Sequence, residues 1–226
     1  MSDYRYPKKL HYAYNKLIID GHHTADEIWD YLLSLGVYPD KDVKEIEIME
    51  IRRGLGHIEL ESFTNLEKVV FGEGITRIPF ELFQAEFVKY ENETSKTKLG
   101  FTKLKEVVCE DVEVVEPYAF WKCGLRSVTF KKPCAIMPNA FRDCANLKEV
   151  NLSSGSVLSR YIFANCPLSK VIVPAKCVVN LLAFGGAKSL KSVYIDSSCS
   201  VREPLFDNKR NKVDVIKIGP SQQKDG

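Results

Sequence analysis

The sequence predicts an α/β repeat solenoid with a parallel β-sheet along one face, and two series of residues support this. Leucines recur every 21 or 22 residues, and a phenylalanine follows each of them after 16 residues. The series are Leu104, Leu125, Leu147, Leu168, Leu190 and Phe120, Phe141, Phe163, Phe184, Phe206. Periods of about 20–29 residues are typical of solenoids, in which a unit buries its apolar face only by stacking on its neighbours.

Residues 1–40 are expected to form a helical hairpin that caps the first coil. The first helix would end at Gly21, and its apolar residues have the i, i+4, i+7, i+8 spacing of one helix face. They are Leu10, Tyr14, Leu17 and Ile18. In the second helix Thr24 and Glu27 form a capping box, and Gly36 marks the end. A cap is expected because an uncovered coil would expose its strand edge and its interior to water.

Residues 41–219 are expected to form the solenoid, and residues 220–226 a disordered tail. With each repeat leucine counted as position 0, residues at 0, +3 and +5 point inward, while those at +2 and +4 lie on the exposed face. Residues at +11 and +16 fill the interior. A degenerate first strand is predicted from Val43, Ile46, Ile48 and Ile51, and a closing strand from Val213, Ile216 and Ile218.

An insertion interrupts the repeats at about residues 85–101. The interval from Phe83 to Leu104 is 21 residues, whereas the other units use 5 or 6. The middle of the insertion is polar and is expected to project from the solenoid, while its flanks either pair as a short hairpin or tuck onto the coil. Insertions in repeat arrays often lie on a functional face, so this one is either a tolerated surface loop or part of a binding site.

The repeat unit carries a recognisable consensus. It reads Leu-x-x-Val-x-Ile/Val/Phe, then Ala/Ile-Phe at +15 and +16 and Cys at +19, although Ala187 and Lys209 replace this cysteine in the last two units. Over about residues 60–218 the pattern resembles the BspA-like leucine-rich repeat family, whose consensus runs approximately A-F-x-x-C-x-x-L-x-x-V-x-I-P. The resemblance implies a curved leucine-rich-repeat solenoid without intrinsic catalysis. It also implies a role as an adhesin or interaction scaffold, often at a cell surface of bacteria or protists.

No catalytic, cofactor or metal site is predicted, so the chain is not expected to be an enzyme. The seven cysteines are at least ten residues apart and occupy repeat positions, which favours buried, reduced thiols. Cys177 and Cys199, at +9 of adjacent units, are the one plausible bridge. All four histidines precede residue 58, far from every cysteine, and no phosphate-binding or nucleophile motif occurs.

Charge and hydropathy limit the classes of partner. The 32 basic and 30 acidic residues give a formal net charge of +2, which lacks the concentrated positive charge that nucleic acids usually require. The N-terminus has no apolar leader, and no window approaches about 18 uninterrupted apolar residues. We therefore expect a cytoplasmic monomer that binds neither nucleic acid nor membranes, with a surface or secreted location as the alternative.

The exposed strand face is the candidate binding surface. Its +4 row is mainly apolar and β-branched, and its +1 row is basic. The candidate residues are Val70, Val108, Arg126, Thr129, Lys148, Asn151, Ile172, Lys191 and Tyr194. This pattern has two explanations: β-propensity on a solvated sheet, or a protein-binding surface anchored by Ile172 and Tyr194.

These observations predict a non-enzymatic solenoid that binds a protein partner through its sheet face, its 86–101 insertion or both. Such a protein could serve as an adaptor or as an inhibitor, and the residues favour neither. The alternative function is that of a surface adhesin or a host-directed effector.

Overall fold

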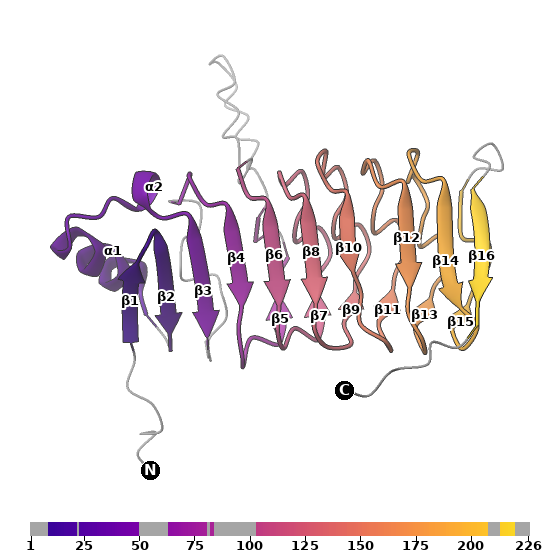
Figure 1. The fold of residues 1–226 in the computed structure, drawn as a ribbon, viewed down its shortest axis with the longest axis horizontal. Helices are drawn as coiled ribbons and strands as arrows, with labels where there is room; N and C mark the ends of the chain where they lie inside the picture. Colours follow the sequence, from indigo (N-terminus) through magenta and orange to yellow (C-terminus); the bar gives the residue numbers. More distant parts are fainter. Residues whose placement is uncertain are drawn as a thin grey trace, which may run out of the picture.

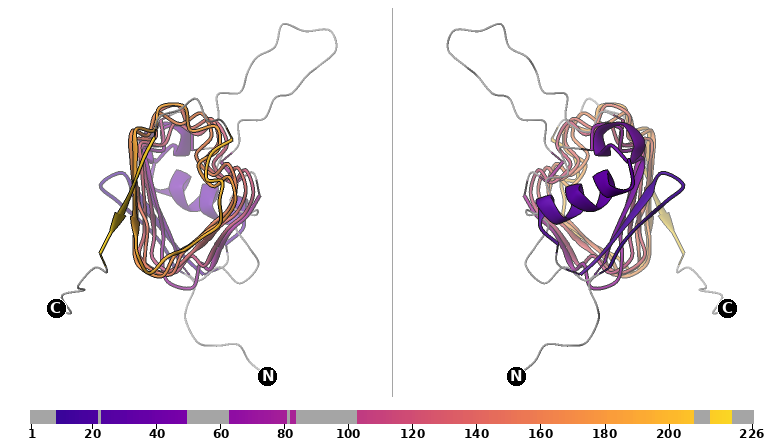
Figure 2. Two further views of the ribbon diagram at one scale, coloured as in Figure 1. Left: turned by 90° about the vertical axis from the view of Figure 1, so that its right-hand side faces the viewer. Right: turned by 90° about the vertical axis from the view of Figure 1, so that its left-hand side faces the viewer.

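The computed structural model describes residues 9–21, 23–49, 63–80, 82–83, 103–207 and 213–219. They form a stack of coils whose strands lie side by side along the long axis of the molecule (Figure 1). Seen end-on, the long strands form one flat wall of the stack (Figure 2). The predicted insertion at 85–101, Ile51 of the first strand and the tail at 220–226 lie outside the described residues.

Three sheets join the coils. The long strands form a seven-stranded sheet with the order β1-β2-β3-β4-β6-β8-β10 and a three-stranded sheet with the order β12-β14-β16. The first contains β1 (Lys9–Ala13), β2 (Lys16–Asp20), β3 (Glu45–Met49), β4 (Lys68–Phe71), β6 (Glu106–Cys109), β8 (Ser127–Phe130) and β10 (Glu149–Asn151). The second contains β12 (Lys170–Val173), β14 (Ser192–Asp196) and β16 (Asp214–Ile218).

Short strands form the third sheet, which is continuous from β5 to β15. Its members are β5 (Arg77–Ile78), β7 (Val114–Val115), β9 (Ala135–Ile136), β11 (Val157–Leu158), β13 (Val178–Val179) and β15 (Ser200–Val201). Every pairing between repeats is parallel, for example Val107 with Val128 and Val157 with Val178. The described coils therefore form the parallel β-solenoid that the leucine period predicts.

The predicted inward positions form the core. Leu104, Val107 and Cys109, at 0, +3 and +5, are at most 1% exposed, whereas Glu106 and Val108 between them are half-buried. The repeated phenylalanines at +16 stack from coil to coil, and the Phe83 and Phe120 centroids lie 4.9 Å apart. This spacing is close to the distance of about 4.8 Å between neighbouring strands, so one aromatic ring per coil fits the stack.

The coils turn sharply around each phenylalanine, at two positions with a left-handed backbone. The residues at +14 are Tyr118, Asn139, Tyr161 and Leu182, with φ between 57° and 60°, and those at +18 are Lys122, Asp143, Asn165 and Gly186. Backbone amides in these turns donate to the following coil, as Phe141 does to the carbonyl of Ile162 at 3.0 Å. The turns therefore form a further hydrogen-bonded seam between coils.

The first predicted helix is wrong, because its residues form the antiparallel hairpin β1–β2. The chain turns at Tyr14 and Asn15, whose φ values of 52° and 65° suit a two-residue hairpin loop. Leu17 and Ile19 are fully buried and alternate with less buried neighbours, as in a half-buried strand. The strand is favoured because β2 pairs with β3 and extends the sheet.

The second predicted helix is confirmed as α1 (Ala25–Ser34). Thr24 Oγ1 accepts from the Glu27 amide at 3.2 Å, and Glu27 Oε2 accepts from the Thr24 amide at 3.0 Å, which completes the capping box. Gly36, with φ 71°, ends the helix. Ile28 and Leu32 are buried against the core, and α1 lies across the N-terminal end of the stack (Figure 2).

A short helix, α2 (Pro39–Asp42), follows α1 and leads into β3, where Ile46 and Ile48 are fully buried as predicted. The predicted boundary after residue 40 stays a prediction, although β1 and β2 share a sheet with the first repeats.

Candidate functional site

The outer face of the long strands aligns the predicted +4 residues into a row. Val70 pairs with Val108, Val108 with Thr129 and Thr129 with Asn151 across the seven-stranded sheet. In the three-stranded sheet the same row continues through paired Ile172, Tyr194 and Ile216. We call the last three residues the apolar patch.

Ile216 was not among the predicted site residues, because the predicted register of β16 is wrong by one residue. The sequence analysis placed Ile216 and Ile218 inward at +3 and +5, but Val215 pairs with inward-facing Val193. The signal in the sequence is a 22-residue step from Leu190 instead of a 23-residue step. At this open end of the described stack packing constrains the choice weakly, since Val215 itself is 45% exposed.

The row is more exposed toward the C-terminal end. Val70, Val108 and Thr129 are half-buried beside their neighbours, whereas Ile172 is 49% exposed and Ile216 is 37% exposed. Large exposed aliphatic side chains that lie together on one sheet are typical of interaction surfaces. Tyr194, between them, is half-buried, and the Lys170 ammonium lies over its ring, 4.6 Å from the centroid.

Charged groups divide the same face into two halves. Around β2–β6 the cations are paired: Lys16 contacts Glu45 and Glu47, Lys68 contacts Glu106, and Lys105 contacts Glu67. The hydrogen bond from Glu47 raises the pKa of Lys16, and that from Lys105 lowers the pKa of Glu67. The N-terminal half of the face is therefore largely neutralised.

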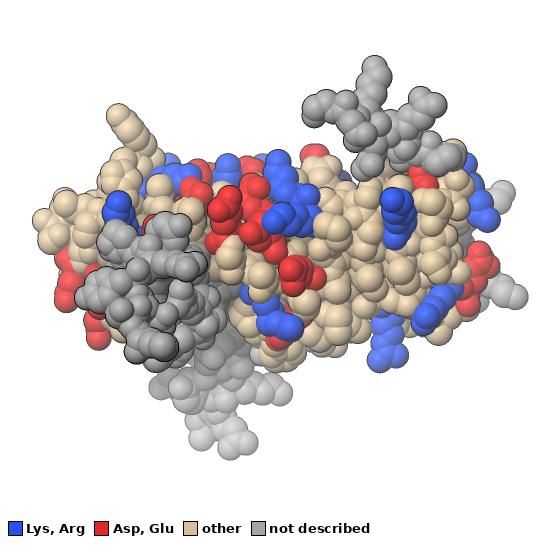
Figure 3. Space-filling model, turned by 90° about the horizontal axis from the view of Figure 1, so that it is seen from below, with Lys and Arg blue, Asp and Glu red and all other residues tan. Residues whose placement is uncertain are grey.

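The C-terminal half of the face carries basic residues without such partners. Within the described part of the chain, no carboxylate lies within 4.0 Å of four exposed cations of the strand face. They are Arg126, Lys148, Lys170 and Lys191. Three of them were predicted site residues, and the structure adds Lys170. By contrast, the face at the ends of the strands mixes both signs, as Figure 3 and the Lys132–Asp111 ion pair show.

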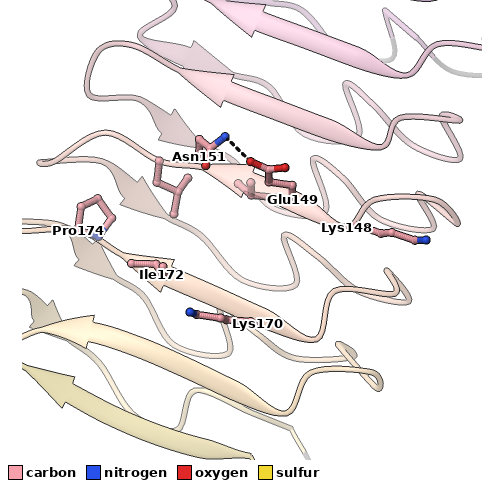
Figure 4. A pocket seen from close by; sticks show the side chains of 8 residues that line it. Lys148, Glu149, Asn151, Lys170, Ile172 and Pro174 are labelled. Atoms are coloured by element: carbon pink, nitrogen blue, oxygen red, sulfur yellow. Dashed lines mark hydrogen bonds between the residues drawn. The ribbon is translucent and has the colours of Figure 1, made fainter.

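An opening separates β10 from β12, the two strands at which the sheets end (Figure 1). It forms a pocket of about 400 Å³ on the outer face. Lys148, Glu149, Val150, Asn151 and Leu152 line it on one side, and Lys170, Ile172 and Pro174 on the other. Figure 4 shows these two groups on neighbouring strands, with Asn151 Nδ2 donating to Glu149 Oε1 at 3.0 Å.

The buried thiols form hydrogen bonds within the core. Cys144 Sγ donates to the carbonyl of Phe120 and Cys166 Sγ to that of Phe141, both at 2.9 Å. Burial raises the pKa of the Cys123 and Cys134 thiols to about 12, which keeps them protonated and unreactive at neutral pH. All seven cysteines are free, and only Cys199 is not fully buried.

Two further searches were confined to the described residues. In these residues, no group of three or more His, Cys, Asp or Glu side chains is arranged to hold a metal ion. Neither α1 nor α2 has the length and apolar character needed to cross a membrane.

The repeats match a known family. Residues 99–191 match six copies of the BspA-type leucine-rich repeat region. These repeats are BspA-type leucine-rich repeats. The family assignment agrees with the parallel β-solenoid and indicates a protein-interaction role in general. Comparisons with curated proteins and with solved structures gave no significant match. The leucine-rich repeats therefore explain the scaffold, whereas the apolar patch, the unpaired cations and the opening are features of this chain.

Proposed function

We propose that this protein is a non-enzymatic binding solenoid that holds a protein partner, as an adaptor or an inhibitor, on the C-terminal half of its outer strand face. One observation carries the proposal: the apolar patch lies beside exposed cations that lack carboxylate partners among the described residues. Apolar and aromatic side chains in the centre of a surface supply binding energy, and surrounding charges supply orientation and specificity.

The paired, half-buried N-terminal part of the same face supports this choice by contrast. Val70 and Val108 occupy the same row as Ile172 and Tyr194, but their neighbouring cations are already bound by carboxylates. A partner that bound there would have to break existing ion pairs. The C-terminal half has no such cost, and its exposed isoleucines lose contact with water when a partner covers them.

The test compares two double variants in a pull-down from lysate of the source cells. Ile172→Ala with Tyr194→Ala truncates the apolar patch, and Val70→Ala with Val108→Ala is the matched control in the same row. We expect the first pair to lose the partner recovered by the unchanged chain, and the second pair to retain it. Equal recovery with all three proteins would remove the apolar patch as the binding surface.

A further inference from the structure

Between β10 and β12 the main-chain ladder of the long strands is interrupted. In the flanking repeats, the amides at +1 and +2 donate to one carbonyl of the preceding coil, as Lys191 and Ser192 do to Ser169 O at 2.9 and 3.2 Å. Within the described chain no hydrogen bond joins Ser169 or Lys170 to the carbonyl of Lys148. Both strands therefore end in open edges in the middle of the wall.

The interruption is confined to this wall. On the short-strand side of the same coils β11 pairs with β13, and the Val178 amide donates to Ser156 O at 2.9 Å. The turns are also connected, because the Tyr161 amide donates to Leu182 O at 2.9 Å. The two coils thus stay attached along two seams while the third is parted.

A local difference in sequence accompanies the opening. Before the repeat leucine, Asn65 Nδ2 donates to Lys41 O at 2.8 Å, and Asn146 Nδ2 donates to Gly124 O at 3.4 Å, which ties each coil to the one before. Pro167 holds this place in the β12 coil and has neither a side-chain donor nor an amide hydrogen. The coil that begins at Leu168 therefore lacks this tie.

The opening gives access to core positions. Val150 and Leu152 occupy +3 and +5 of β10, yet both are only partly buried. At the same positions of neighbouring coils, Val128 is 0% and Val171 3% exposed. An apolar side chain that entered from the outer face would contact Val150 and Leu152.

The donors at the opening are suited to an extended chain. Ser192 directs its amide to the preceding coil, so the equivalent Lys170 and, two residues on, Ile172 direct theirs toward β10. Amides spaced by two residues on an open strand edge pair with the carbonyls of another strand, not with a helix. Unpaired edges of this kind are otherwise avoided in natural sheets.

The charge at the opening favours an acidic segment. Lys148 and Lys170 stand at its two sides, and Glu149, its one lining carboxylate, already accepts from Asn151. We propose that the opening binds an extended acidic segment of the protein partner, whose main chain pairs with the edge of β12 and whose apolar side chain reaches Val150 and Leu152. This inference rests on the proposed function, because it names the part of the partner that the outer face would hold.

The test uses the whole chain and a defined probe, the peptide acetyl-(Glu-Val)4-amide. We expect saturable binding by isothermal titration calorimetry, with slower hydrogen exchange at the Lys170 and Ile172 amides. Lys148→Ala with Lys170→Ala should weaken binding at least tenfold, because both cations beside the opening are lost. Lys68→Ala with Lys105→Ala is the matched control from the paired half of the face and should leave binding within twofold. A probe N-methylated at alternate residues should not bind, because it lacks main-chain donors.

Three results would overturn the inference: equal binding of the lysine analogue acetyl-(Lys-Val)4-amide, unchanged exchange at the two amides, or tighter binding of a ten-residue oligothymidylate. The pull-down separates this inference from the proposed function. If Lys148→Ala with Lys170→Ala retains the partner while Ile172→Ala with Tyr194→Ala loses it, the outer face binds without the opening. If both pairs retain it, the proposed function fails as well.

Discussion

The rings of Phe120 and Phe141 lie face to face, with centroids 5.0 Å apart and planes inclined by 6°. Both side chains are fully buried, and Phe141 continues the stack to Phe163 at 5.8 Å. Truncation of Phe141 therefore removes ring contacts on both sides and leaves a cavity between two coils.

We expect Phe141→Ala to lower the free energy of unfolding by about 3–5 kcal/mol, measured by urea denaturation. Phe206→Ala is the control, because Phe206 occupies the same repeat position but is only partly buried. Its loss should be clearly smaller. Similar losses in both variants would show that ring stacking inside the solenoid contributes nothing beyond the size of the side chain.

Stability should fall at alkaline pH because thiols ionise more readily in the unfolded chain. Burial raises the pKa of Cys134 from about 9 to about 12, so between these values the folded state holds the proton that the unfolded state releases. The contribution is complete below about pH 9 and is lost as the pH rises. Each such thiol lowers the free energy of unfolding by about 1.4 kcal/mol per pH unit.

The measurement is urea unfolding at pH 8.5 to 10.5 with a reductant present. Cys134→Ala should have a shallower dependence on pH than the unchanged chain, while the lysines and the other six thiols are common to both. Identical slopes would mean that the Cys134 thiol ionises as easily in the folded chain as in the unfolded one.

A polar ladder crosses three coils at Asp143. Trp121 Nε1 donates to Asp143 Oδ2 at 2.9 Å, and Asn165 Nδ2 donates to Oδ1 at 2.7 Å. Burial opposes ionisation of the carboxyl, but these two hydrogen bonds, with help from Arg142, outweigh it and lower the pKa of Asp143. The carboxylate therefore stabilises the fold above its unfolded pKa, about 3.9, and the gain is lost as the pH falls through the lower folded value.

We expect Asp143→Ala to cost about 1.5–3 kcal/mol at pH 7 and much less near pH 2.5. Asn165→Ala removes one of the two hydrogen bonds and should cost less at pH 7. Chemical denaturation at both pH values checks this, with Trp121 fluorescence as a local signal. A loss that is the same at pH 2.5 and pH 7 would contradict a role for the charge.

The capping box of α1 should support the N-terminal end of the stack. Thr24→Ala removes the side-chain acceptor for the Glu27 amide and should cost about 1 kcal/mol in thermal or urea unfolding. Ser34→Ala, at the other end of the helix, is the control, since its hydroxyl only donates to the Tyr31 carbonyl within the last turn. Equal effects of the two substitutions would argue against the cap.

Much of the fold follows from the sequence because one physical requirement repeats in every coil. Positions such as Leu104, Val107 and Phe120 must be apolar to stack on their equivalents, so the period fixes strands, core and turns together. The outer row from Val70 to Tyr194 follows from the same register. The site was predictable only as a row of positions, because exposure within that row depends on three-dimensional packing.

The errors lie where the repeat is absent or interrupted. Leu10, Leu17 and Ile18 fit a helical spacing, but pairing of β2 with β3 decided for a strand, and a single sequence does not show which pairing is available. At β16 a one-residue slip exchanged the two faces, and Ile216 was missed. The opening at Pro167 was not foreseen either, because hydrogen bonds between coils are not visible in a hydrophobic pattern.

The reversal of β1 gives the array a direction. β2 to β16 run parallel, so a duplicated unit could join after β16 and continue the same hydrogen bonding. Before β2 it could not, because antiparallel β1 occupies that edge and α1 closes the core behind it. Gene duplication can therefore lengthen such an array at its interior and its far end, but not through its start. The variable length of related arrays should accordingly arise downstream of the hairpin.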